Sequence, residues 1–228
     1  RPDGKFKLSF YSHKDDYGQS VLTSVRPDDY SFRKDENVFQ IPCGKCVGCR
    51  LDYSRRWADR MLIEFSENNF KALFVTLTYN NEHIPFAIDS DSDLPVGFSL
   101  CKRDFQLFNK RLRKHFSEKT LRFFACGEYG STTLRPHYHA IFFGLSLSDF
   151  SDCRPVGINE LKQPYFTSSA FEHIWSNGFV CLADCSYNTF AYVTRYNLKK
   201  VFGDNILPTP FSEPSFLLMS RRPGIASS

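Results

Sequence analysis

The segment Arg135–Gly144, which reads RPHYHAIFFG, constrains the fold more than any other part of the chain. Pro136 favours an extended backbone before it, and the aromatic and β-branched run that follows is typical of a strand. Residues two positions apart in a strand share a face, so His137 and His139 project side by side while Tyr138 points the other way. The rest of the run is apolar on both faces. The segment therefore predicts a central strand that is covered on both sides of its sheet.

A second strand is predicted just upstream, at Leu121–Cys126, and it runs into the sequence GEYG. Only a short polar loop at 131–135 separates the two strands, so we expect them to form an antiparallel hairpin. Such a hairpin brings Glu128 beside His137 and His139. Two neutral imidazoles and one carboxylate suit Mg²⁺, Mn²⁺ or Fe²⁺ acting on a bound substrate. A chance pair of histidines with no function is the alternative, because short motifs match often by accident.

Composition narrows the class of protein. The 228 residues are 42% hydrophobic and include 24 Phe, enough for a substantial core or for stacking on nucleic-acid bases. A net charge of only +4 argues weakly for nucleic acid, so local clusters of charge must decide. No apolar run of about 18 residues predicts a membrane span, and no export signal is visible. Eight cysteines without such a signal favour reduced thiols or metal ligands over disulfides.

The remaining segments alternate between strand and helix patterns. Residues 1–36 are polar without a clear period, and we interpret them as an extended arm or loops. From residue 38 the predicted order is strand, helix, strand, helix, hairpin, helix, strand and helix. The predicted strands outside the hairpin are 38–41, 73–79 and 179–182, and the predicted helices are 50–68, 102–115, 171–175 and 191–200.

Three cysteines follow the first of these strands at Cys-x2-Cys-x2-Cys spacing. Cys43, Cys46 and Cys49 could supply most of a tetrahedral thiolate site for a structural Zn²⁺. The fourth ligand is not evident from the sequence. A glycine-rich turn with incidental cysteines is the other interpretation, and the sequence leaves both open.

Basic side chains gather on two predicted helices. The helix at 102–115 is the most basic segment of the chain, and it could follow a DNA backbone or simply present a solvated face. The helix at 50–68 carries arginines around an apolar stripe. These arginines could likewise contact a DNA backbone or simply form a solvated face. The candidate DNA-binding residues are Arg55, Arg56, Arg103, Lys110, Arg111, Lys114, Arg135 and Arg195.

The helix at 191–200 places two tyrosines on one face. Tyr192 and Tyr196 are four residues apart, and Lys199 continues the stripe with Lys200 beside it. Tyrosines facing a core are the usual explanation of such a stripe, but lysines are not core residues. A phenol has a pKa near 10 and needs help to act as a nucleophile at neutral pH. Nearby ammonium groups favour the phenolate and can balance charge on a phosphate.

These motifs together resemble the replication initiators of the His-hydrophobic-His endonuclease superfamily. The resemblance rests on Glu128, the triplet at 137–139 and the tyrosine–lysine helix at 192–200, and FVTLTY at 74–79 resembles the first motif of that superfamily. PCGKCVGCR at 42–50 and MSRRPGI at 219–225 are similar to the gokushovirus-like branch of the microviruses. The central Tyr138 is bulkier than the usual aliphatic residue.

The resemblance implies an α+β fold with a central antiparallel sheet of about five strands and flanking helices. It implies an N-terminal arm or loops at 1–36, an endonuclease domain at 37–203 and a C-terminal extension at 204–228, truncated because members of the family generally continue. The activity it implies is rolling-circle initiation by metal-dependent nicking and joining of single-stranded DNA through a 5′-phosphotyrosine. Glu128, His137 and His139 would hold Mg²⁺ or Mn²⁺, and Tyr192 or Tyr196 would attack. The partners would be an origin in single-stranded DNA and host replication proteins, in the cytoplasm of a bacterial host.

Three other functions remain compatible with the residues. A non-catalytic, zinc-containing nucleic-acid-binding protein would bind DNA without cutting it. A non-haem iron oxygenase also uses two histidines and a carboxylate, but it would give the tyrosine–lysine helix no role. A transposase or plasmid relaxase of the same superfamily is the third, and the paired tyrosines favour an initiator over transposases with one tyrosine.

Overall fold

The computed structural model describes residues 7–14, 17–25, 38–42, 46–158, 163–202 and 207–227. The chain divides into two compact units, Arg1–Ser54 and Arg55–Ser228. The domain bounds expected from the resemblance, at 36/37 and 203/204, stay predictions. Residues 207–227 are grouped with the second unit.

The first unit contains a three-stranded antiparallel sheet of order β2-β1-β3. Its strands are β1 (Lys7–Lys14), β2 (Ser20–Val25) and β3 (Val38–Pro42). The strand expected at 38–41 is confirmed, but the arm or loops expected for 1–36 are wrong over β1 and β2. The physical reason is that β1 pairs with β3, from Lys7 opposite Pro42 to Tyr11 opposite Val38, and such a distant partner leaves no mark on the local pattern.

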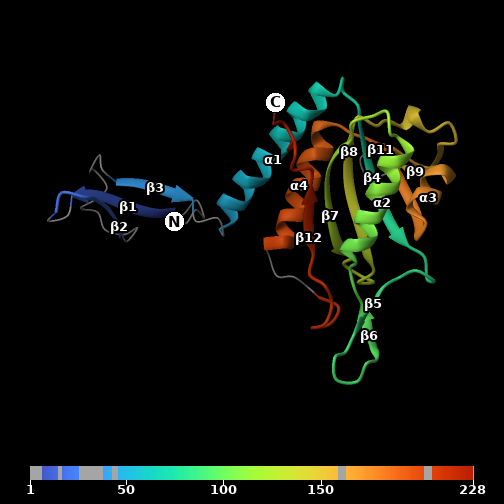
Figure 1. The fold of residues 1–228 in the computed structure, drawn as a ribbon, viewed down its shortest axis with the longest axis horizontal. Helices are drawn as coiled ribbons and strands as arrows, with labels where there is room; N and C mark the ends of the chain where they lie inside the picture. Colours follow the sequence, from blue (N-terminus) through green and yellow to red (C-terminus); the bar gives the residue numbers. More distant parts are fainter. Residues whose placement is uncertain are drawn as a thin grey trace. The chain divides into compact units, whose positions relative to one another are not determined.

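The second unit is built on a seven-stranded sheet in which every neighbouring pair is antiparallel (Figure 1). This confirms the α+β class, with seven strands where about five were expected. The strand order is β12 (Phe216–Met219), β7 (Arg122–Tyr129), β8 (Pro136–Phe143), β4 (Ala72–Tyr79), β11 (Gly178–Asp184), β10 (Pro164–Thr167) and β9 (Arg154–Ile158). Four of the expected strands lie in this sheet, and the fifth, at 38–41, is β3 of the first unit. The additional strands of this sheet are β9, β10 and β12. All are four or five residues long, and Pro155 and Pro164 obscured two of them, since proline is tolerated only near a sheet edge.

Helices cover both faces of this sheet. The helices α2 (Lys102–His115) and α3 (Ser169–Trp175) pack on one face, where Phe105, Phe108 and Trp175 join the larger core cluster. The other face is covered by α4 (Tyr187–Phe202) and by α1 (Val47–Glu67) from Arg55 onwards (Figure 1). As the alternating pattern of β8 predicts, Tyr138 belongs to the first core cluster and Ile141 to the second. The histidines of β8 therefore face the layer of α1 and α4.

The face under α2 and α3 is held by a buried polar network as well as by aromatic packing. The hydroxyl groups of Tyr79 and Tyr138 lie 2.6 Å apart, and that of Tyr79 donates to Asp104 at 2.7 Å. Burial is the main cause that raises the pKa of both phenols. Arg111 of α2 donates to the carbonyl oxygens of Ile174 and Trp175, both at 2.7 Å, and so satisfies the C-terminal end of α3.

The C-terminal segment is tied into the second unit by an ion pair. Glu64 is almost fully buried, lies 2.8 Å from Arg122, and accepts a hydrogen bond from the backbone N–H of Ala226 at 2.8 Å. Arg60 donates to the carbonyl oxygen of Ile225. Ile225 itself is buried in the cluster beneath α1 and α4. These contacts hold the segment around Ile225 and Ala226 against α1 and β7.

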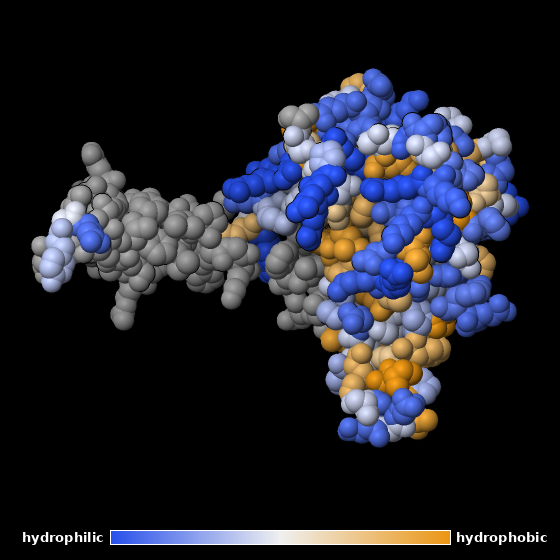
Figure 2. Space-filling view, viewed as in Figure 1, coloured by the Kyte–Doolittle hydropathy of each residue, from blue (hydrophilic) through white to orange (hydrophobic). Residues whose placement is uncertain are grey.

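A small hairpin extends from the segment between β4 and α2. It consists of β5 (Phe86–Ile88) and β6 (Pro95–Phe98), and Figure 2 shows apolar residues at its surface. Phe86, Ile88 and Leu94 are each about half exposed or more. A short 3₁₀ helix, η2 (Leu147–Asp149), follows β8. Within the described ranges, no helix combines the length and the apolar character needed to cross a membrane.

Candidate metal centre and its nucleic-acid face

Glu128, His137 and His139 come together as the hairpin predicts. Glu128 lies directly opposite His137 in the β7–β8 pairing. Its Oε1 atom is 2.8 Å from Nε2 of His137 and 3.1 Å from Nε2 of His139. Across the described residues, this is the group of three or more His, Cys, Asp or Glu whose ligand atoms all lie within 4.8 Å of one another. Two imidazole nitrogens and one carboxylate oxygen that lie this close together form a donor set that fits a divalent cation.

The outer nitrogens of both imidazoles have partners of their own. Nδ1 of His137 lies 3.2 Å from the carbonyl oxygen of Arg135, which can only accept, so Nδ1 carries a hydrogen. Nε2 faces Glu128, and it can bind a metal ion only when it carries no hydrogen of its own. Nδ1 of His139 lies 2.9 Å from the hydroxyl of Thr76. Phe74 stacks on the ring of His139 at 5.6 Å between centroids. Metal-binding histidines in proteins are usually held by such outer partners, which supports a metal at this point.

The carboxyl of Glu128 is buried and yet ionised. Burial by itself would raise its pKa, but hydrogen bonds from His137 and His139 and their charge outweigh burial and hold the pKa well below the usual range. Glu128 is only 2% exposed, whereas both histidine side chains remain partly exposed. The group therefore combines a buried anionic carboxylate with two imidazole nitrogens that are partly open to solvent.

Helix α4 lies on the same face of the sheet as this group. Because Asp184 at the end of β11 pairs with Leu73, α4 begins at the end of the sheet remote from His137. Phe190 in its first turns packs on Phe143, with 6.0 Å between ring centroids. Figure 1 shows that α4 then returns along the sheet toward the end where β8 begins. The tyrosine–lysine helix thus runs over the histidine face, as a shared site requires.

Tyr192 and its neighbours on α4 are described to different extents. The Tyr192 side chain is 57% exposed, unlike the buried phenols of Tyr79 and Tyr138 on the opposite face. Tyr196 and Lys199 lie within the helical backbone, but their side chains, with those of Arg195 and Lys200, lie outside what the structure describes. The roles assigned to Tyr192, Tyr196, Lys199 and Lys200 stay predictions.

The candidate DNA-binding cations separate into two layers. Arg55 and Arg56 are exposed on α1, in the layer that covers the histidine face. Arg103, Lys110, Arg111 and Lys114 belong to α2, on the opposite face. The guanidinium of Arg111 donates two hydrogen bonds to the C-terminal end of α3, so this residue has a structural role that does not involve DNA. Periodicity placed these cations on helices but could not show which face of the sheet each helix covers.

The cysteine motif remains a prediction. Cys43 lies outside the described residues, while Cys46 and Cys49 are half buried at the start of α1. The backbone N–H of Cys49 donates to Sγ of Cys46 at 3.4 Å, a contact that fits a turn with or without a metal.

The profile of the family described as replication-associated protein ORF2/G2P matches residues 72–201, more than half of the chain. The chain belongs to this family. The match runs from β4 to α4, so it includes the ligand group and the tyrosine helix.

The individual relatives are replication-associated proteins of viruses, in agreement with the resemblance seen in the sequence. The chain is 34% identical over 165 residues to replication-associated protein ORF2 of Spiroplasma virus 4, covering 71% of this chain and 48% of the relative. It is 32% identical over 168 residues to replication-associated protein VP4 of Bdellovibrio phage phiMH2K, covering 73% and 50%. The chain thus spans about half the length of these relatives. No solved structure gives a significant match.

Sequence reasoning missed the residues that orient the ligands. Thr76 was seen only as part of a strand, although its position on the polar side of FVTLTY was a signal. Its partner His139 is 63 residues away, and the β4–β8 pairing brings the two opposite each other. The carbonyl oxygen of Arg135 left no sequence signal at all.

Proposed function

We propose that this protein initiates rolling-circle replication in a bacterial host by nicking and joining single-stranded DNA, with a tyrosine as the nucleophile. The single observation that carries the proposal is the convergence of Glu128, His137 and His139 on one face of the sheet, beneath the layer that contains α4. Membership of a family named for replication supports the same role. A free 3′ hydroxyl would prime synthesis by host replication proteins.

Glu128, His137 and His139 would hold Mg²⁺ or Mn²⁺. Such an ion supplies Lewis acidity, which polarises a phosphoryl oxygen and orients the scissile phosphate. The protein contributes the ionised carboxylate, the two Nε2 atoms, and the outer contacts from Thr76 and Arg135 that fix both rings. Holding the phosphate in one orientation converts the attack of a nearby group into an intramolecular step.

A tyrosine of α4 would make the attack. Its phenolic oxygen would form a bond to phosphorus while the bond from phosphorus to the 3′ oxygen breaks. The proton of the phenol would pass by way of solvent to the departing 3′ oxygen, which becomes the free 3′ hydroxyl. One phosphate ester replaces another, so the step needs no ATP. Tyr192 is exposed and suits this role, whereas the buried Tyr79 and Tyr138 have raised pKa values, chiefly through burial, and face the opposite layer.

Two tyrosines one helical turn apart would allow two successive transfers. While Tyr192 or Tyr196 holds the 5′ end of one strand, the other can cut the next origin. Lys199 or Lys200 would stabilise the developing phenolate and phosphate charge. The target strand must be single-stranded or unpaired to reach the site, as it must for enzymes that modify bases.

The decisive experiment is incubation with labelled single-stranded circular DNA and Mn²⁺, followed by a denaturing gel. We expect a protein-linked 5′ end that disappears in the double variant Tyr192→Phe, Tyr196→Phe. Tyr187→Phe, at the start of the same helix, is the matched control and should leave the adduct intact. An adduct that survives the double change would refute the tyrosine assignment. Binding without any cut would favour the non-catalytic alternative.

A further inference from the structure

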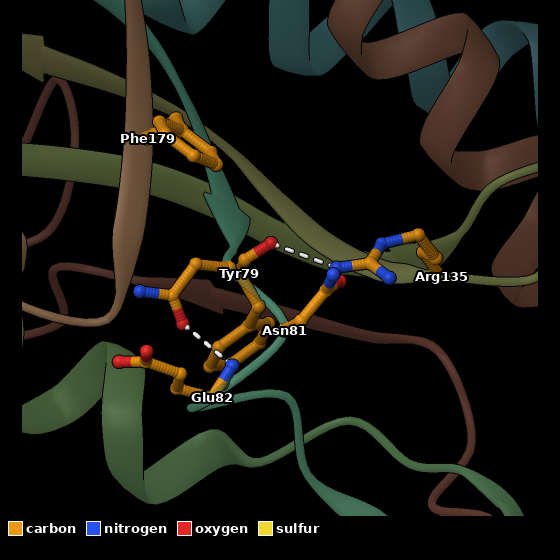
Figure 3. A pocket seen from close by; sticks show the side chains of 6 residues that line it. Tyr79, Asn81, Glu82, Arg135 and Phe179 are labelled. Carbon is orange, nitrogen blue, oxygen red and sulfur yellow. Dashed lines mark hydrogen bonds between the residues drawn. The ribbon is translucent and has the colours of Figure 1, made fainter.

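A pocket of about 280 Å³ opens at the end of the sheet beside the ligand group. It is lined by the last residue of β4 and the loop that follows it, by the residue that precedes β8 and by the start of β11 (Figure 3). The lining residues are Tyr79, Asn80, Asn81, Glu82, Arg135 and Phe179. The metal-centre chemistry described above does not use the side chain of any of them.

The pocket and the ligand group share one row of the sheet. Glu128 pairs with His137, His137 with Thr78, and Thr78 with Phe179, so these four residues occupy opposed positions on neighbouring strands. Directly opposed residues of an antiparallel sheet point to the same face. Two strand spacings separate Phe179 from His137, which is about 10 Å. Arg135 also joins the two sites, because it lines the pocket while its carbonyl oxygen contacts Nδ1 of His137.

The aromatic wall of the pocket is open to solvent. Phe179 is 61% exposed, so its ring face is not used by the core. It adjoins Gly178, whose φ of +154° and close approach to Thr78 and Asn80 exclude any larger side chain. The hydroxyl of Thr78 donates to the carbonyl oxygen of Phe179. An aromatic ring held at an exposed position next to a phosphate site is the usual platform for stacking an unpaired base.

The opposite wall is built in advance by hydrogen bonds. Oδ1 of Asn80 accepts from the backbone N–H groups of Glu82 and His83 at 3.1 and 2.9 Å, which fixes the loop after β4. Arg135 donates to the carbonyl oxygen of Tyr79 at 3.0 Å, as Figure 3 shows. These contacts make the pocket largely preformed, as ligand sites usually are.

The charges in the pocket fit a base better than a phosphate. Glu82 is exposed and acidic, and its carboxylate would repel a phosphate while accepting from an N–H group of a base. Asn81 is exposed as well and offers both donors and an acceptor. Arg135 provides a planar cation that can hydrogen-bond or stack. Base edges present donors and acceptors together, whereas a phosphate presents acceptors alone.

We propose that this pocket binds one unpaired base of the DNA strand whose phosphate lies at the ligand group, with Phe179 as the stacking platform. The inference rests on the proposed function for the identity of the strand, and it adds a nucleotide subsite to the phosphate site. Glu82 and Asn81 would contact the edge of the base. The subsite would determine which nucleotide neighbours the cut.

The test separates base binding from cleavage by working without metal. Fluorescence anisotropy in EDTA would measure the affinity of the protein for a labelled 15-nucleotide oligothymidine and for a fully abasic 15-mer. We expect Phe179→Ala to weaken binding of the oligothymidine by about 5- to 100-fold, the range for loss of one stacked base, and to leave the abasic strand unaffected. Phe179→Leu should lose nearly as much, and Phe179→Tyr should bind like the parent protein.

Phe70→Ala is the matched control, because Phe70 is 68% exposed and precedes the opposite end of β4. It should bind both strands like the parent protein. The proposal is overturned if Phe179→Ala binds oligothymidine normally, or if it weakens both strands equally, which would indicate a phosphate site. Nicking in Mn²⁺ is scored separately. If the parent protein never cuts DNA but Phe179→Ala weakens binding of oligothymidine alone, the proposed function is refuted and the subsite is retained. If the parent protein cuts DNA but Phe179→Ala binds oligothymidine normally, the subsite is refuted and the proposed function is retained.

Discussion

The hydroxyl of Thr76 lies 2.9 Å from Nδ1 of His139, on the neighbouring strand of the central sheet. This contact fixes the plane of the imidazole and aims its Nε2 atom at Oε1 of Glu128. An imidazole ring that is held in this way loses little conformational freedom when its Nε2 atom binds a metal ion. Thr76 would therefore be a positioning residue that acts through His139 on a metal bound at this group.

The Thr76 contact predicts a graded effect on metal affinity. Thr76→Val removes the hydroxyl and keeps the shape, so we expect the affinity for Mn²⁺ to fall by about 10- to 100-fold. Thr76→Ser keeps the hydroxyl and should stay close to the parent protein. Isothermal titration calorimetry with Mn²⁺ measures both. Equal affinities for the valine variant and the parent would show that the contact does not orient the ligand.

Removal of the imidazoles predicts loss of metal-dependent nicking. The double variant His137→Ala, His139→Ala leaves only Glu128 of the donor set, so both Mn²⁺ binding and DNA cleavage should be abolished. His173→Ala, an exposed histidine on α3 beneath the opposite face, is the control and should cut normally. EDTA should abolish cleavage by the parent protein to the same extent. Cleavage that continues in the double variant would exclude these histidines as ligands.

The lowered pKa of Glu128 predicts how its contribution to stability depends on pH. A carboxyl whose folded pKa lies below its unfolded value stabilises the protein fully above the unfolded value, which is about 4.3 for Glu, and loses that contribution as pH falls through the folded pKa. The metal-free parent and Glu128→Gln should therefore differ most in their free energy of unfolding near neutral pH. The difference should shrink below about pH 4. Urea titrations at several pH values would measure it, and a constant difference would contradict the ion pairing.

Arg111 predicts a change in stability that its basic neighbours do not share. Loss of its two hydrogen bonds to the end of α3 should lower the free energy of unfolding by about 1.5–3 kcal/mol in Arg111→Ala. Lys110→Ala, at the exposed next position of α2, should change it by less than about 0.5 kcal/mol. Thermal or urea unfolding of both variants is the measurement. A silent Arg111→Ala would mean that the end of α3 is satisfied in another way.

The same two variants also test the DNA face. Because α2 covers the sheet face opposite the histidines, neither change should alter the salt dependence of DNA binding. Arg55→Ala and Arg56→Ala, on the layer of α1, should each reduce the salt slope by about one phosphate contact. A larger effect from α2 than from α1 would place the DNA on the other side of the molecule.

The sequence by itself determined the elements whose patterns are local. The alternation in RPHYHAIFFG was enough to place the histidines on one face and Tyr138 on the other, and a short loop was enough to predict the hairpin that brings in Glu128. Helical spacing located α1, α2 and α4, because one apolar stripe suffices to mark a helix. The ligand group was accessible to sequence reasoning because all three of its members belong to one hairpin.

Only the tertiary structure decided the relations between distant segments. Strand β12 joins the sheet from the far end of the chain, Thr76 meets His139 across 63 residues, and Phe179 reaches the row of Glu128 through two intervening strands. The choice of face for each helix is of the same kind, since an amphipathic pattern says that a helix has a buried side and not what that side meets. Such contacts arise from the packing of whole layers, so no local pattern of residues records them.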